Sequence, residues 1–374
     1  MRRSLTPLFL LLGLTLAAQN DAPARSAEEK LQQRSAVLDP VQGGWAVEAI
    51  NEFAETGTVL FSTGNNSSDV KIQLDQFRAE RNSALAKNQG ALTAAEERRL
   101  SQLAGAMNAL APSSFEAHLA NFYIDFPRPK AFEELALAKA KDTGRPELLA
   151  PLLVAAARTD DATELTARAR AMKLEGAVAP GLYRFAADLF SSLDPDAILI
   201  AAGEMDAYPM WVEQFANGRR KDVLVVDQRL LIDPLYRTRI WGRAKAAGPV
   251  PQADGFIAAL GRSSPRPVFL SLGLGARMMA PLSNDLYVTG LAMRLSTSPV
   301  ENIPRLEERW GRFKKAMDAG PLSKNYLVPG AVLLAHYRKI GDEARASRLE
   351  AELRTMAARL GATNNMIKSG VFAH

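Results

Sequence analysis

The chain has 374 residues, of which 47% are hydrophobic and 23% charged, the composition of an ordinary globular protein with two or three domains. Its formal charge of +5 comes from basic residues scattered along the sequence, so nucleic-acid binding has little support. The lack of cysteine excludes disulfides, thiolate metal sites, iron–sulfur clusters and cysteine nucleophiles, and the three histidines lie too far apart in sequence to suggest a zinc site.

The first 18 residues have the pattern of a signal peptide. Two arginines, Arg2 and Arg3, precede an apolar run from Leu5 to Leu16, and small residues follow it. This run is shorter than the roughly 20 residues that span a bilayer, and no later segment is apolar for long enough. We therefore expect an exported protein, periplasmic or secreted, with no transmembrane segment after cleavage. The alternative is an uncleaved membrane anchor. Residues 19–44 are expected to form a linker.

Residues 45–190 are predicted to be mainly helical. A run of β-branched residues indicates one strand at 58–63, and the pattern over 69–78 is compatible with either helix or strand. Thr93 and Glu96 have the spacing of a capping box that would begin the next helix. Further helical segments separated by short polar turns indicate degenerate helical hairpins, of the kind that stack in TPR-like helical repeats.

Residues 194–300 have the pattern of an α/β unit. Asp233 followed by Pro234 is typical of an N-cap and the first residue of a helix, which we expect to reach about Ala247. The alternation of strands and helices implies a small parallel sheet with right-handed crossovers. Apolar runs bounded by turn residues place its four predicted strands at 196–202, 222–227, 267–271 and 286–295.

Residues 301–374 are predicted to be helical again and to end in a hairpin. Tyr337, Gly341 and Ala346 have the offsets of a TPR-type helix pair, in which glycine permits the turn and alanine allows close packing. The expected fold class is therefore α/β plus all-α. It combines a TPR-like helical N-terminal region, a small parallel α/β unit and a C-terminal helical hairpin.

Two segments resemble a known family. The stretch from Ala197 to Tyr236 contains a strand, a motif similar to G-[DE]-x-D-T-[FY]-P-x-W, a helix and a second strand, and Leu286–Arg294 is similar to Y-x-T-G-L-A-Y-R. Both patterns occur in the soluble C-terminal part of a bacterial family of unknown function, whose members are multi-spanning membrane proteins described as protein O-mannosyltransferase-like glycosyltransferases. The residues that match the first motif are Gly203, Glu204, Asp206, Tyr208, Pro209 and Trp211.

The chain departs from this family in three respects. Ala207 replaces the usual threonine, Asp227 stands where asparagine is usual, and the membrane portion has no counterpart. The resemblance covers roughly residues 195–360. It implies a related fold and a link to envelope glycosylation, and it does not imply transferase activity.

The candidate site consists of Glu204, Asp206 and Asp227, with Tyr208 and Trp211 beside them. The carboxylates follow neighbouring predicted strands, and open α/β sheets bind ligands at this edge. They could bind sugar hydroxyls or a divalent cation, with an aromatic ring as a stacking surface. The purely structural interpretation makes Asp206 a helix cap and Trp211 a core residue, and a catalytic carboxylate pair is the third alternative.

No catalytic residue, metal ligand or cofactor is assigned from the sequence. Gly273 and Gly275 follow a predicted strand, but the third glycine of a dinucleotide-binding loop and the lysine of a P-loop are both missing. The first hypothesis is therefore an exported, non-enzymatic binding or scaffold protein that recognises an envelope protein or a glycan. The alternatives are an accessory module of envelope protein glycosylation and a carboxylate- or metal-dependent carbohydrate-active enzyme.

Overall fold

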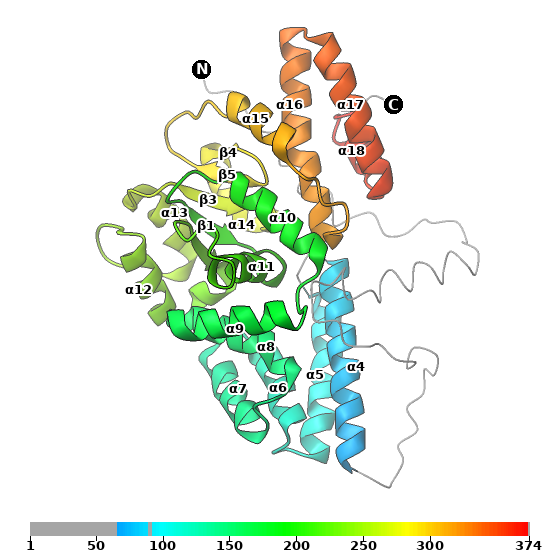
Figure 1. Ribbon diagram of the computed structural model, residues 1–374, viewed down its shortest axis with the longest axis vertical. Coiled ribbons are helices and arrows are strands. Elements are labelled where there is room, and N and C mark those ends of the chain that lie inside the picture. The colour runs from blue at the N-terminus through cyan, green and yellow to red at the C-terminus, as the bar shows by residue number, and fades with distance from the viewer. Residues whose placement is uncertain (1–65, 89–91, 373–374) are drawn as a thin grey trace, which may run out of the picture.

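The computed structural model describes residues 66–88 and 92–372 of the chain (Figure 1). The predicted signal peptide, the linker and the strand at 58–63 lie outside the described residues. The described part is mostly helical and contains one small mixed sheet. None of the helices in this part is both long and apolar enough to cross a membrane. One continuous hydrophobic core extends from Val70 to Phe372, so it passes through the described parts of the three regions predicted at 45–190, 194–300 and 301–374.

The N-terminal helices pack as consecutive pairs, α4 on α5, α6 on α7 and α8 on α9. In Figure 1 the long α4 and α5 lie side by side at one end of the molecule. This pairing agrees with the predicted helical hairpins, whereas a TPR-like repeat remains a prediction. The bounds are α4 Asn66–Lys87, α5 Ala94–Leu110, α6 Phe115–Asp125, α7 Pro129–Lys141, η2 Pro146–Leu148, α8 Leu149–Thr159 and α9 Ala162–Leu174.

Helix α4 settles the ambiguous segment at 69–78. Val70, Leu74 and Phe77 are buried at helical spacing, and Arg81 continues the same face one turn later. Ile72 is 39% exposed, so an apolar side chain points away from the core. The pattern was ambiguous because the exposed Ile72 lies between the buried Val70 and Leu74 and gives the alternation of apolar residues that is typical of a strand.

Helix α5 begins with the predicted capping box. The Glu96 N–H donates to Thr93 Oγ1 at 3.3 Å, and the Thr93 N–H donates to Glu96 Oε2 at 2.7 Å. These two bonds satisfy N–H groups that the start of a helix leaves without partners.

The sheet has five strands in the order β2-β1-β3-β5-β4. β1 pairs in parallel with both β2 and β3, whereas β5 is antiparallel to β3 and to β4. The prediction of a parallel sheet is therefore correct for three strands and wrong for the sheet as a whole, which is mixed. The strands are β1 Ile198–Ala201, β2 Leu224–Asp227, β3 Val268–Ser271, β4 Leu286–Val288 and β5 Ala292–Leu295.

The single strand predicted at 286–295 is a hairpin of β4 and β5. Gly290 lies in the turn with φ +148°, and the Thr289 N–H donates to the Ala292 carbonyl at 3.0 Å. A side chain at position 290 would also collide with Ser192, whose Oγ lies 2.4 Å from an ideal Cβ there. The apolar residues on both sides of this turn gave the segment the appearance of one continuous strand. The reversal makes β5 antiparallel to β3.

Helix α11 connects the helical layers to the sheet, because it packs on α9, on α10 and on β2. It begins at Glu204, three residues after the end of β1. The Asp233 cap of α12 is confirmed, since its carboxylate accepts the Leu235 N–H at 2.9 Å, but α12 ends at Arg243. The elements of this region are α10 Pro180–Ser191, α11 Glu204–Phe215, η3 Gln228–Ile232, α12 Pro234–Arg243, α13 Ala253–Ser263, α14 Ala276–Met279 and η4 Ala280–Asp285.

The C-terminal helices include the predicted hairpin of α16 and α17, which pack on each other. Gly341 joins them with φ +75°, a left-handed conformation that favours glycine, and its N–H caps the end of α16. The hairpin lies at the end of the molecule opposite α4 and α5 (Figure 1). The bounds are α15 Ile303–Arg312, η5 Gly320–Tyr326, α16 Leu327–Ile340, α17 Glu343–Arg359 and α18 Thr363–Lys368.

Gly330 allows α15, α16 and α17 to pack closely. A Cβ at this position would lie 2.4 Å from Leu353 Cδ2 and 2.9 Å from a ring carbon of Trp310. We expect Gly330→Ala to lower the free energy of unfolding, measured in urea, by about 1–3 kcal/mol because it overpacks the core. Gly311→Ala is the control, since nothing lies within 4 Å of its Cβ position. The control should be neutral or stabilising by up to about 1 kcal/mol. Equal effects would contradict this account.

Candidate functional site

The two strands that lead to the candidate carboxylates are parallel neighbours, as predicted. Ala201 at the end of β1 is in register with Asp227 at the end of β2. Glu204 follows β1 as the first residue of α11, so the carboxyl ends of both strands meet at one edge of the sheet. The structure therefore brings Glu204, Asp206 and Asp227 together. All three are buried, with exposed fractions of 9%, 1% and 0%.

Asp206 holds the turn between β1 and α11. Its two carboxylate oxygens accept the backbone N–H groups of Ala202 and Gly203, each at 2.9 Å. Burial raises the pKa of Asp206 and outweighs these donors and the Ser271 hydroxyl, which lower it. Asp206 thus caps α11 from the third position of the helix, and Gly203 occupies the N-cap position.

Glu204 is bound by two arginines from different parts of the chain. Arg81 of α4 approaches its Oε1 atom to 2.6 Å, and Arg229, just after β2, reaches the same atom at 2.9 Å. Burial opposes ionisation of Glu204, but the two guanidinium groups outweigh it and hold the pKa of this carboxyl below its usual value. Glu204 therefore joins the N-terminal helices to the sheet edge as a buried anion.

Asp227 forms a two-pronged ion pair with Arg229. Arg229 Nε donates to Oδ1 at 3.0 Å and Nη2 donates to Oδ2 at 2.6 Å, and the Arg229 backbone N–H also donates to Oδ1 at 3.0 Å. This fork geometry is the strong form of an arginine–carboxylate pair. Both Asp227 oxygens are therefore occupied by protein donors.

Aromatic rings enclose the two arginines. Arg81 lies over the ring of Tyr123 at 4.3 Å, and Arg229 lies over Phe126 at 4.8 Å. Tyr208 accepts a hydrogen bond from Arg229 Nη2 at 3.4 Å, and burial raises its pKa well above the usual value. These contacts stabilise the two cations, whose side chains are only 9% and 19% exposed.

Trp211 stacks on Tyr208 with ring centroids 5.5 Å apart and is 3% exposed. All five predicted residues therefore lie close to one another, in a buried network in which each carboxylate has protein donors.

Sequence reasoning missed the arginines Arg81 and Arg229. The signals for them were a basic residue on the buried face of α4 and an arginine two positions after Asp227. Within residues 66–88 and 92–372, no group of three or more His, Asp or Glu side chains is arranged to hold a metal ion.

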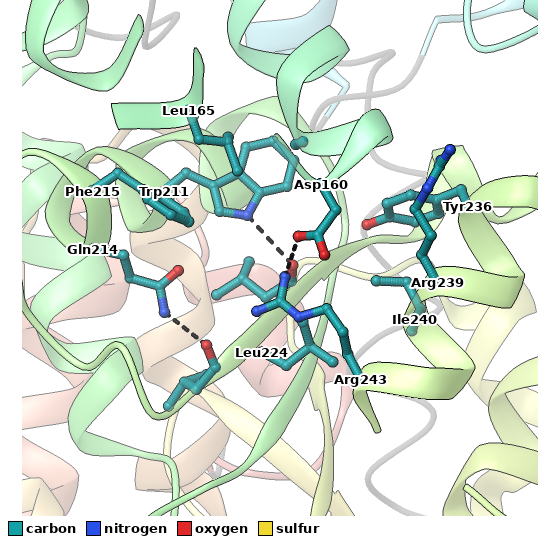
Figure 2. A pocket seen from close by; sticks show the side chains of 13 residues that line it. Asp160, Leu165, Trp211, Gln214, Phe215, Leu224, Tyr236, Arg239, Ile240 and Arg243 are labelled. Carbon is teal, nitrogen blue, oxygen red and sulfur yellow. Dashed lines mark hydrogen bonds and ion pairs between the residues drawn. The ribbon is translucent and has the colours of Figure 1, made fainter. Parts of the chain in front are cut away.

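A small pocket lies on the other side of Trp211, at the free edge of β2 (Figure 2). Side chains satisfy this edge: Trp211 Nε1 donates to the Val225 carbonyl at 3.4 Å, and Gln214 Nε2 donates to the Val223 carbonyl at 2.8 Å. An edge strand without such cover is prone to pairing with other chains. Arg243 reaches Asp160 of the helical layer at 2.5 Å on the rim. The pocket has about 30 Å³ of water-accessible space.

Residues 182–254 match the family model of TMEM260-associated domain 2. This family is linked to a protein O-mannosyltransferase-like membrane protein. The matched segment runs from α10 to the start of α13 and contains all five predicted site residues, but it spans much less than half of the chain. Comparison with curated proteins and with solved structures gives no significant match.

Arg229 takes part in two of the three ion pairs at the sheet edge, those with Glu204 and Asp227. We expect Arg229→Met to lower the free energy of unfolding by about 3–5 kcal/mol, because it leaves buried Asp227 without its charged partner. Arg312→Met removes the exposed pair of Arg312 with Glu308, and should cost no more than about 0.5 kcal/mol. Urea denaturation of both variants tests this. A loss below about 1 kcal/mol for Arg229→Met would contradict the structural role.

Proposed function

We propose that this chain is an exported, non-enzymatic binding protein and that its partner is another protein. Its export is inferred from the signal-peptide pattern of residues 1–18. The observation that carries the proposal is an exposed apolar surface around the start of α12. Ile232, Leu235 and Val250, here named the α12 apolar surface, have exposed fractions of 51%, 60% and 37%. Apolar side chains gathered in solvent are typical of protein interaction sites.

Arg237 orders the backbone segments that carry the α12 apolar surface. This side chain is 5% exposed and donates to the carbonyls of Leu231 and Ile232 at 2.6 and 3.0 Å. It also donates to the Pro251 carbonyl at 3.1 Å, which fixes the segment containing Val250 beside Ile232. A surface whose backbone is already ordered loses little entropy on binding, and this favours a specific partner.

The buried carboxylates give little support to a catalytic role. Glu204 and Asp227 are neutralised by arginine, and Asp206 is occupied by two backbone N–H groups. A general acid or nucleophile has to reach its substrate, and these side chains are buried in protein contacts. The carbohydrate-active or metal-dependent enzyme is therefore the less supported alternative.

The pocket beside Trp211 offers little to a glycan. Its volume is about 30 Å³, so it can enclose only a small part of a sugar ring. Of the three aromatic residues that line it, Trp211 and Tyr236 are 3% and 2% exposed and present little ring surface for stacking, whereas Phe215 is partly exposed.

A second candidate is an accessory module of envelope protein glycosylation. The family match over residues 182–254 favours it, because the matched family is linked to a protein O-mannosyltransferase-like membrane protein. The α12 apolar surface lies within that same segment. Under this alternative the partner is a multi-spanning membrane protein of the glycosylation machinery. Identification of the partner that is crosslinked in the following experiment distinguishes the two candidates.

Replacing the α12 apolar surface should abolish partner binding without unfolding the protein. We expect Ile232→Ser with Leu235→Ser to reduce recovery of a crosslinked envelope partner by about tenfold or more, since central apolar contacts dominate interface energies. The matched control is Leu137→Ser with Leu174→Ser, two leucines that are 47% and 84% exposed on other helices. The control should bind as the wild type does. If both double variants retain the partner, or lose it equally, the α12 apolar surface is not the docking site.

A further inference from the structure

Three arginines converge on a single carboxylate at a surface away from the α12 apolar surface. Asp194 lies in the turn between α10 and β1, and Arg294 of β5 reaches its Oδ2 atom at 3.0 Å. Arg305 and Arg309, both from α15, reach Asp194 at 2.9 and 3.1 Å. These four residues, the Asp194 arginine cluster, come from three segments that are distant in sequence.

The cluster carries a local excess of positive charge. Three guanidinium groups and one carboxylate leave a formal balance of +2. Of the nearby charged groups, Glu308 pairs with Arg312 at 2.9 Å, and Arg220, which donates to the Asp194 carbonyl, pairs with Asp222 at 2.9 Å. Glu308 also acts on Arg309, but counting Glu308 together with its partner Arg312 leaves the formal balance at +2. Like charges held this close repel one another, and an added anion would relieve the repulsion.

Several donors of the cluster are unused and accessible. Arg294 and Arg305 each bind Asp194 through Nη1 alone, so their Nε and Nη2 groups make no hydrogen bond to the residues that the structure describes. The side chain of Arg305 is 47% exposed and that of Arg294 is 29% exposed. Arg309 is held more firmly, because it is 12% exposed and also donates to the Thr289 carbonyl at 2.6 Å. The cluster therefore combines one fixed guanidinium group, that of Arg309, with the unused donors of the more exposed Arg294 and Arg305.

We propose that the Asp194 arginine cluster binds the phosphoryl group of a phosphorylated ligand. A phosphate monoester carries a charge of about −1.5 to −2 and presents three acceptor oxygens. This charge matches the excess of the cluster, and guanidinium forks bind phosphate through paired hydrogen bonds. A single carboxylate already occupies one side of the three arginines. The donors that remain, on Arg294 and Arg305, belong to partly exposed side chains and can serve the oxygens of an added anion.

Titration calorimetry with inorganic pyrophosphate and with inorganic phosphate tests the proposal on the whole chain. We expect Arg305→Gln to weaken pyrophosphate binding by about tenfold or more, because a charge-assisted hydrogen bond is lost. Arg312→Gln is the control, since Arg312 lies on the same helix but pairs with Glu308. It should leave the affinity unchanged within about twofold. Asp194→Asn should tighten binding, because it removes the resident negative charge and retains the shape.

Vesicles distinguish the two sources of a phosphoryl group. Binding to phosphatidylcholine vesicles that contain phosphatidic acid, lost in Arg305→Gln, would support a lipid headgroup. Binding of pyrophosphate with no vesicle binding would support a soluble ligand. The proposal is overturned if the wild type binds neither phosphate, pyrophosphate nor these vesicles, or if Arg305→Gln and Arg312→Gln bind alike. The comparison of these two exposed variants decides the matter even if Asp194→Asn fails to fold.

Discussion

The buried ion pairs at the sheet edge determine how the helical part of the chain and the α/β unit meet. Arg81 comes from α4, Glu204 from the start of α11, and Arg229 with Asp227 from the end of β2. Buried ion pairs add little net stability compared with apolar packing, but removal of one partner leaves a charge that the protein interior cannot solvate. A placement of α4 that separated Arg81 from Glu204 would leave buried charges without their partners, so the network disfavours such placements. It contributes more to the choice of this arrangement than to the overall stability of the fold.

Other features of the molecule depend on this arrangement. The placement of α11 brings Trp211 and Gln214 onto the free edge of β2, where they bind its exposed carbonyls. The same helix packs on α9 and α10, so the helical layer and the sheet share one core. The chain then presents its apolar and cationic surfaces on a rigid base. The α12 apolar surface and the Asp194 arginine cluster lie on different elements and could bind independently.

Local patterns predicted the elements well, because their causes are local. The Thr93 capping box, the Asp233 cap and the parallel pairing of β1 with β2 all follow from short sequence signals. The reversal at Gly290 was missed, because apolar residues flank the turn on both sides. The arginine partners of the carboxylates were missed for another reason. Arg81 is 123 residues from Glu204, and no local pattern shows that a charge on α4 faces a charge on α11.

A double-mutant cycle between Arg81 and Glu204 tests the central claim most directly. The free energies of unfolding in urea are needed for the wild type, Arg81→Met, Glu204→Gln and the combined variant. If the network joins α4 to α11, the combined variant should be more stable than the sum of the single losses implies, with a coupling of about 1–3 kcal/mol. Losses that add to within about 0.5 kcal/mol would show that the two side chains act independently, and this would contradict the account.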